Sequence, residues 1–212
     1  MATFKDGIFG PASGSVGNVI LSHRNGKPYI RSKPDKIHNP QTPRQLASRK
    51  KLSLMSAMLS TFKPFIRAGF TELPKGLSTR DVAYSANSKR VFTGEYPDIN
   101  IDYSKVLVSG GTLTSASGAG VALDGNILKF TWDSVPQPGK PSGDHDMAMV
   151  LVYHDKIDSV EYSLRAAERR SGQFELEIPQ NMASLPDSLH TWISFTSADG
   201  RRTSDSEYLQ VS

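Results

Sequence analysis

The order of apolar and polar positions predicts a mainly β protein. From residue 101 to residue 212, short apolar runs alternate with turn signals such as Asp124-Gly125-Asn126 and Asp199-Gly200. The clearest strand is 172–178, where apolar and polar residues alternate with a period of two. Several short strands separated in this way are typical of an antiparallel sandwich. We therefore expect residues 101–212 to fold alone as an Ig/fibronectin-III-like β-sandwich with Trp132 in its core, and the lack of cysteine favours the fibronectin-III type.

Residues 1–41 predict a basic, glycine-rich arm that contains a β-hairpin. Two apolar stretches flank Asn25-Gly26, the dipeptide that most strongly favours a tight hairpin turn. We expect the hairpin at residues 18–31. Residues 1–20 should be rich in turns, because glycine adopts the left-handed conformations that turns require. The glycines in question are Gly7, Gly10, Gly14 and Gly17.

A single amphipathic helix is predicted over residues 42–70. Thr42 is suited to cap its N-terminus, Pro43 to occupy its first turn and Gln45 to complete a capping box. Pro64 should kink or end the helix. Its apolar residues recur at helical spacing and are Leu46, Leu52, Leu54, Met55, Met58, Leu59, Phe62, Phe65 and Ile66.

Residues 71–100 are expected to be an irregular connection between the helix and the sandwich. The segment is broken by Pro74, Gly76, Gly94 and Pro97. Its short apolar stretches fit a helix and a strand equally well.

The charge is distributed unevenly along the chain, whose net charge is +4. Residues 1–68 carry 12 Lys and Arg against 2 Asp and Glu, a net charge of +10, and residues 69–212 carry 13 against 19, a net charge of −6. Such asymmetry points to an acidic partner for the first part, which is nucleic acid, an acidic protein or the acidic region of a neighbouring copy. The candidate partner-binding residues are its basic side chains: Arg24, Lys27, Arg31, Lys33, Lys36, Arg44, Arg49, Lys50 and Lys51.

The residue types that carry catalysis or metal binding do not form a workable constellation. Without cysteine the chain has no disulfide, thiolate nucleophile or cysteine-ligated metal. The acidic and histidine residues at 144–146 and 154–155 flank one strand, which holds the two groups too far apart to share an ion. The segment around Ser15 lacks the first glycine of a nucleophile elbow. We expect a non-enzymatic protein with no cofactor, no metal and no small-molecule substrate.

No leader peptide or membrane insertion is predicted. Asp6, Gly7 and Gly10 interrupt any apolar stretch near the N-terminus. A run of about 18 apolar residues, as a membrane span needs, is absent from the sequence. We therefore expect a cytoplasmic or virion-associated protein.

Four parts of the sequence carry a resemblance to known proteins. They are the Gly-x-x-Gly-Asn-Val opening that ends at Val19, Asn-Pro-x-Thr-Pro-x-Gln-x-x-x-Arg at 39–49, the Trp132 strand and Ser-Asp-Ser-Glu-Tyr at 204–208. Through them the chain resembles, over most of its length, a family of Bacteroidetes proteins of unknown function, DUF6266. Segment 39–49 is also similar to short segments of some phage virion and tail-associated proteins. Neither resemblance implies an activity or a catalytic residue.

These features favour a structural or self-assembling protein, phage-like in kind, that docks through its basic N-terminal arm on a neighbouring copy or an acidic protein. The apolar face of a lone helix also needs a cover, so we expect a homo-oligomer or a larger protein assembly. A nucleic-acid-associated protein that uses the same arm is the alternative. A carbohydrate- or surface-binding sandwich is a second alternative, which requires Trp192 or Tyr153 to be exposed.

Overall fold

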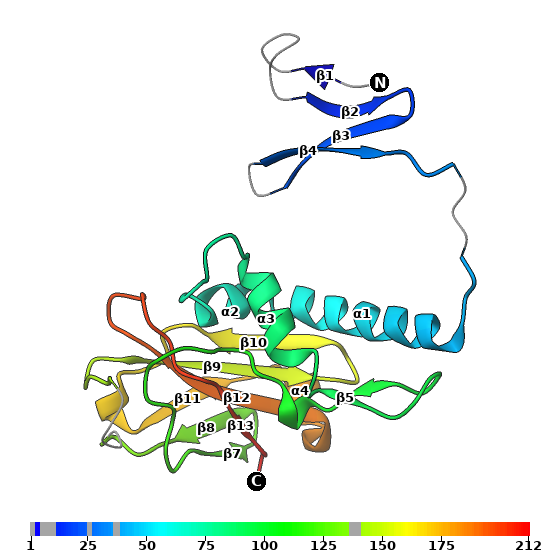
Figure 1. Cartoon of the computed structure of the whole chain (residues 1–212). Helices are drawn as coiled ribbons and strands as arrows, with labels where there is room; N and C mark the ends of the chain where they lie inside the picture. Colours follow the sequence, from blue (N-terminus) through cyan, green and yellow to red (C-terminus); the bar gives the residue numbers. More distant parts are fainter. Residues whose placement is uncertain (1–2, 5–11, 25–26, 36–38, 136–140) are drawn as a thin grey trace. The chain divides into compact units, whose positions relative to one another are not determined.

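The chain is organised as two compact units, residues 1–42 and 43–212, which we call the N-terminal unit and the C-terminal unit. A computed structural model describes residues 3–4, 12–24, 27–35, 39–135 and 141–212 (Figure 1). The named strands in both units pair antiparallel, and the fold is mainly β with helices concentrated between residues 43 and 87.

The N-terminal unit is a four-stranded sheet with the order β1-β2-β3-β4. β3 and β4 form the hairpin that the sequence predicts, with Leu21 opposite Ile30. The predicted Asn25-Gly26 turn lies outside the described residues. Residues 12–16, expected in a turn-rich segment, form strand β2, which turns into β3 through Gly17 at a φ of 54°. The strands are β1 (Thr3–Phe4), β2 (Ala12–Val16), β3 (Val19–Arg24) and β4 (Lys27–Ser32).

Two antiparallel sheets pack against each other in the C-terminal unit (Figure 1). The larger has the order β10-β9-β12-β13 and the smaller β11-β8-β7. Their facing side chains form one hydrophobic core, in which Trp132, the residue directly after β8, packs edge-on against Phe195 of the larger sheet. The strands are β7 (Gly120–Asp124), β8 (Ile127–Thr131), β9 (Met147–His154), β10 (Ser159–Ser163), β11 (Gln173–Glu177), β12 (Leu189–Thr196) and β13 (Glu207–Leu209).

Helices α1 (Pro43–Thr61), α2 (Lys63–Gly69) and α3 (Thr79–Asn87) cover the other face of the larger sheet. Their buried side chains, such as Met55 and Phe62, form a second core with Leu151 and Trp192 of the sheet. Successive residues of β9 therefore point into different cores. This burial on both sides explains why the sequence of β9 is apolar almost without interruption.

The helix begins at Pro43 and is interrupted at Phe62, between α1 and α2. Pro64 lies in the first turn of α2, so the break falls next to the proline that the sequence predicts to kink or end the helix. Leu52, expected in the apolar stripe, is 53% exposed, because the buried stripe of α1 starts only at Met55. From there on, the apolar face of the helices packs on the chain's own sheet. The expectation that this face needs a partner to cover it is therefore wrong.

The segment 71–100 is more regular than expected. It contains α3 and strand β5 (Phe92–Thr93), which pairs with β6 (Asn100–Ile101). The remaining short elements are the helix α4 (Gln180–Ala183) and the 3₁₀ turns η1 (Tyr103–Lys105), η2 (Arg169–Ser171) and η3 (Pro186–Ser188).

The C-terminal unit starts at Pro43 and not near residue 101, where the sandwich was expected to begin. The reason is that α1–α3 share a core with the larger sheet. A fragment of residues 101–212 would expose the sheet face that carries Met149, Leu151 and Trp192. This arrangement argues against independent folding of that fragment.

Candidate binding surfaces

One face of the N-terminal sheet is apolar and exposed. Val16 lies opposite Val19, and Leu21 lies opposite Ile30. Residues directly opposite share a face, and so do residues two apart on one strand, so these four side chains form one surface. Val16, Val19 and Ile30 are 50%, 39% and 68% exposed. None of the side chains at 12–23, 27–35 and 39–42 is fully buried, so these residues form no core of their own.

The opposite face of the same sheet is basic. Lys27, Tyr29 and Arg31 alternate along β4 and are exposed. Lys33 follows the strand and is also exposed, whereas Lys36 lies outside the described residues. Arg24 lies opposite Lys27 in the ladder. The structure thus places part of the predicted basic set on one face of one sheet.

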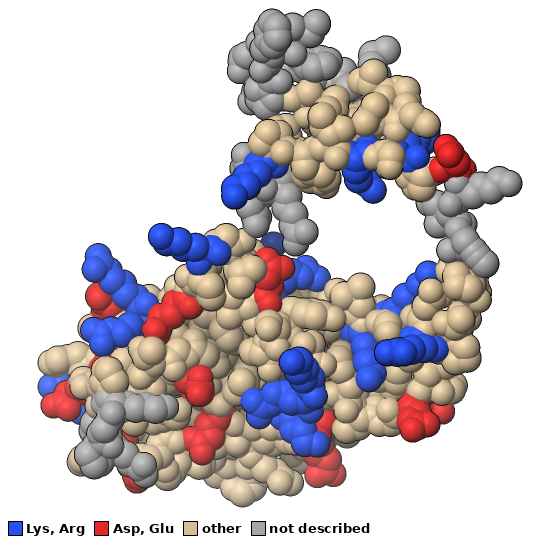
Figure 2. Space-filling model, in the orientation of Figure 1, with Lys and Arg blue, Asp and Glu red and all other residues tan. Residues whose placement is uncertain are grey.

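The other predicted basic residues lie on the exposed first half of α1. They are Arg44, Arg49, Lys50 and Lys51. Figure 2 shows Lys and Arg side chains gathered over this helix. The ammonium of Lys51 lies 5.5 Å from the centre of the Phe92 ring, a cation–π distance. The helix has no acidic residue in its first turn to complement the dipole.

The division into units changes the meaning of the charge asymmetry. Residues 1–42 carry 6 Lys and Arg against 2 Asp and Glu, and residues 43–212 carry 19 of each. The N-terminal unit therefore has the whole net charge of +4, and the C-terminal unit is neutral. The acidic residues after position 69 are balanced by basic residues of α1 and α2 in the same unit. An acidic neighbour made of the same C-terminal unit is therefore a weaker electrostatic partner than the sequence suggests.

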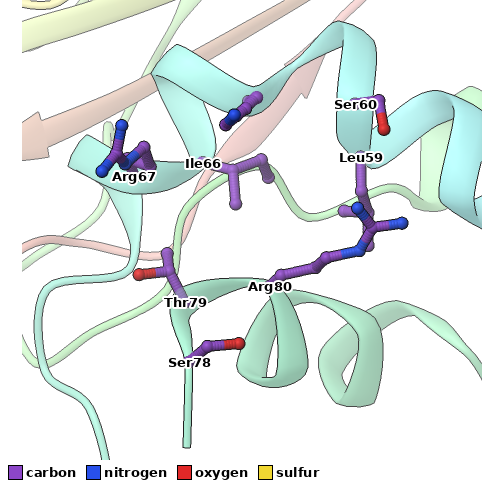
Figure 3. Close-up of a pocket in the computed structure, with 8 residues that line it drawn as sticks. Leu59, Ser60, Ile66, Arg67, Ser78, Thr79 and Arg80 are labelled. Atoms are coloured by element: carbon purple, nitrogen blue, oxygen red, sulfur yellow. The ribbon is translucent and has the colours of Figure 1, made fainter. Parts of the chain in front are cut away.

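A groove of about 610 Å³ lies between the end of α1, α2 and the start of α3, and we call it the α2–α3 groove. Figure 3 shows Arg67 at one end, with Arg80 reaching from α3 toward Leu59 at the other. Ile66 lies between them, and it and Leu59 are buried. The groove is lined by Leu59, Ser60, Lys63, Ile66, Arg67, Ser78, Thr79 and Arg80.

In the described parts of the chain, the basic side chains of this groove have no acidic partner. Among the described residues, no carboxylate lies within ion-pairing distance of Lys63, Arg67 or Arg80. The closest acidic residue in sequence, Asp81, is engaged in a capping box: its carboxylate accepts from the Ser78 backbone N–H at 3.0 Å and from the Ser78 hydroxyl at 2.7 Å. The groove is thus a positively charged hollow.

Aromatic and titratable side chains cluster under the helices. The Nδ1 atom of His190 lies 3.1 Å from the Tyr208 hydroxyl, its Nε2 atom lies 3.9 Å from Asp155, and its ring is 4.4 Å from that of Tyr103. Burial lowers the pKa of His190 despite the attraction of Asp155. Burial likewise raises the pKa of Tyr103 and of Tyr153. These shifts favour neutral side chains, as in a packed core.

The acidic and histidine residues near position 145 are engaged in structural contacts. His145 pairs with Glu168 at 3.2 Å. Asp146 accepts the Gly143 backbone N–H at 2.9 Å and lies 3.7 Å from the buried guanidinium of Arg169. In the described ranges, no three His, Asp or Glu side chains are grouped as a metal site would need. Nor is any described helix long and apolar enough to cross a membrane.

The condition for a carbohydrate-binding sandwich is not met. Trp192 is fully buried, and its indole N–H donates to the Val106 carbonyl at 3.1 Å. Tyr153 is 7% exposed, and its hydroxyl donates to Asp158 at 2.9 Å. Neither ring offers a stacking surface.

Residues 11–210 match a family described as a family of unknown function, DUF6266. The chain belongs to this family. The resemblance inferred from the sequence is thereby confirmed, and the DUF6266 match spans parts of both units. No curated protein and no solved structure matches the chain significantly. The likeness to phage virion proteins receives no support from these comparisons.

Proposed function

We propose that this DUF6266 protein is a structural, self-assembling protein whose N-terminal unit docks on a second copy of the chain. The observation that carries the proposal is the exposure of Val16, Val19 and Ile30 on one face of a sheet whose described side chains include none that is fully buried. A thin sheet of this kind gains stability when its apolar face is covered. The proposal assigns no catalytic role to any residue.

A second copy is the occupant that this face fits best. Two apolar sheet faces pack about 10 Å apart, and a two-fold axis places the same residues on both sides. The described strands of the sheet carry no Lys, Arg, Asp or Glu on this face, so two copies bring no like charges into the contact. The basic faces then point outward.

The expected dimer is weak. Four strands at the usual spacing, each up to six residues long, cover roughly 300 Å² in projection. A stable interface buries about 800 Å² on each partner. We therefore expect association that depends on protein concentration, with tighter contacts only where several copies assemble.

The C-terminal unit serves this assembly as a rigid scaffold, and we infer that β7–β13 form an Ig/fibronectin-III-like sandwich. The strand order supports this inference. Strands β7, β8 and β11 form one sheet, and strands β9, β10, β12 and β13 form the other. The chain crosses between the sheets after β8, β10 and β11, as in Greek-key sandwiches.

Two isoleucines on opposite faces of the N-terminal sheet provide a matched test. Ile30→Thr removes apolar surface from the proposed interface, and Ile20→Thr makes the same change on the basic face, where Ile20 lies opposite Arg31. Burial of an isoleucine contributes roughly 2 kcal/mol, so Ile30→Thr should weaken dimerisation at least about tenfold in sedimentation equilibrium. Ile20→Thr should leave it near the wild-type value. Equal affinities for both variants would refute the proposed interface.

Salt separates self-association from the nucleic-acid alternative. The net charge of each N-terminal unit opposes pairing of two copies, and salt screens this repulsion. Dimerisation through the apolar face should therefore strengthen as NaCl rises. Binding of nucleic acid by Lys27, Arg31 and Lys33 would instead weaken log-linearly with salt. Tight, salt-sensitive binding of DNA or RNA without self-association would favour the alternative.

A further inference from the structure

We propose that the α2–α3 groove binds the phosphate group of a small anionic ligand. Three cationic side chains, Lys63, Arg67 and Arg80, line one hollow, and none has a carboxylate partner in the described chain. The three positive charges around the groove repel each other. A bound anion is attracted to all three and offsets this repulsion. The site is separate from the N-terminal sheet and does not depend on the assembly proposal.

The two arginines favour a phosphate over a single carboxylate. A guanidinium offers several N–H donors in a planar fork, which matches two oxygens of a phosphate. Arg67 comes from α2 and Arg80 from α3, and in Figure 3 they approach the groove from different elements. A tetrahedral dianion can accept from both arginines and from Lys63 at once. A monocarboxylate has only two oxygens and one charge.

The start of α3 adds donors of the right kind. Its first two residues, Thr79 and Arg80, line the groove. Backbone N–H groups in the first turn of a helix have no partner within the helix. The capping box occupies the N–H groups of Ser78 and Asp81 and leaves those of Thr79 and Arg80 available. The carboxylate of Asp81 opposes an anion here, so the three cations remain the main source of attraction.

The size of the groove indicates more than a bare phosphate ion. A volume of about 610 Å³ lies within the range of pockets that hold small organic ligands. Leu59 and Ile66 line the groove but are nearly buried, so a ligand that fills this volume would contact mainly the polar and cationic side chains around them. We therefore assign the groove to a small organic phosphate.

The test measures binding of inorganic phosphate, pyrophosphate and acetate to the full chain by calorimetry at constant ionic strength. The proposal predicts saturable binding of phosphate and tighter binding of pyrophosphate, with no detectable binding of acetate. Arg67→Gln and Arg80→Gln should each weaken phosphate about tenfold, as expected for the loss of one charge-assisted contact. The control Lys156→Gln/Arg202→Gln removes two exposed cations elsewhere on the unit and should leave the affinity unchanged.

Two results would overturn the proposal. One is equal response to acetate and phosphate, which indicates general anion screening. The other is phosphate binding that survives in Arg67→Gln/Arg80→Gln or falls equally in the control. If the double variant loses its fold by circular dichroism, phosphate affinity is measured for Lys63→Gln alone, because the Lys63 side chain is exposed. An affinity equal to that of the wild type would then overturn the proposal. Self-association of each variant, measured in parallel, should not change.

Discussion

The two units of this chain use apolar residues in opposite ways. The C-terminal unit encloses them in two cores, one between the sheets and one beneath the helices, and the larger sheet contributes to both. The N-terminal unit leaves Val16, Val19 and Ile30 exposed together on one face of a single sheet, and Ile30 is 68% exposed. The C-terminal unit therefore has what it needs to fold alone, and the N-terminal unit has a surface that gains from a partner.

Removing the helices should prevent cooperative folding of the C-terminal unit. Residues 43–212 should melt cooperatively, whereas residues 101–212 should not, because Met149, Leu151 and Trp192 lose their cover. Thermal unfolding followed by circular dichroism distinguishes the two fragments. A cooperative melt of 101–212 at the temperature of 43–212 would show that the helices are not part of the folding unit.

A tryptophan in one unit and a tyrosine in the other should differ sharply in their effect on stability. Trp132 is 5% exposed, and its indole donates to the Arg169 carbonyl at 2.8 Å. Trp132→Ala should lower the free energy of unfolding by roughly 3–5 kcal/mol. Tyr29→Ala, on the exposed face of β4, should change the unfolding of the C-terminal unit by less than about 0.5 kcal/mol. Urea titration gives both values, and similar losses would contradict the separation into units.

One buried amide joins the end of α3 to the loop that follows η1. Asn87 donates to the carbonyls of Ala83 and Leu107 at 2.9 and 2.8 Å and accepts the Leu107 N–H at 2.8 Å. Asn87→Ala leaves buried backbone groups without partners and should destabilise the C-terminal unit by about 2–3 kcal/mol. The exposed Asn100→Ala serves as control and should be nearly neutral in the same urea titration. A neutral Asn87→Ala would mean that the loop rearranges to satisfy its own backbone.

Acid should weaken the C-terminal unit through His190. Its folded pKa is lowered by burial, so near pH 6.5, the ordinary value, the unfolded chain takes up a proton that the folded chain does not. Stability is thus fully present above that pH and is lost as the pH falls below it, although the nearby Asp155 reduces the effect. His190→Gln should flatten the profile of melting temperature between pH 7 and 5. His23→Gln, on the exposed N-terminal sheet, should leave it unchanged; a flattened profile there would point to a different origin.

Local signals predicted the elements well, because they depend on neighbouring residues alone. Pro43 lies at the start of α1, Pro64 lies in the first turn of α2, and β3 pairs with β4 as the hairpin prediction requires. The uninterrupted apolar run of β9 also carried a signal that a simple sandwich does not explain: burial on both sides. A strand that is buried on both sides needs a second layer over its sheet. The helices that begin at Pro43 form this layer, which is why the C-terminal unit starts there.

The α2–α3 groove could be predicted only in part. Lys63 and Arg67 are four residues apart and share a helix face, which spacing alone reveals. The capping signal Ser78-Thr79-Arg80-Asp81 marks the start of α3. How the connection between α2 and α3 folds back, and so brings Arg80 beside α2, depends on tertiary packing. The sequence alone therefore does not predict which of the many exposed basic residues line the groove.

Sedimentation equilibrium of the full chain and of residues 43–212 measures whether the N-terminal unit drives self-association. We expect a monomer–dimer equilibrium for the full chain that shifts toward dimer with concentration and with salt. Residues 43–212 should stay monomeric under all the same conditions, because the apolar sheet face is gone and both cores remain. Identical behaviour of the two proteins, whether both are monomers or both are dimers, would contradict an assembly role for the N-terminal unit.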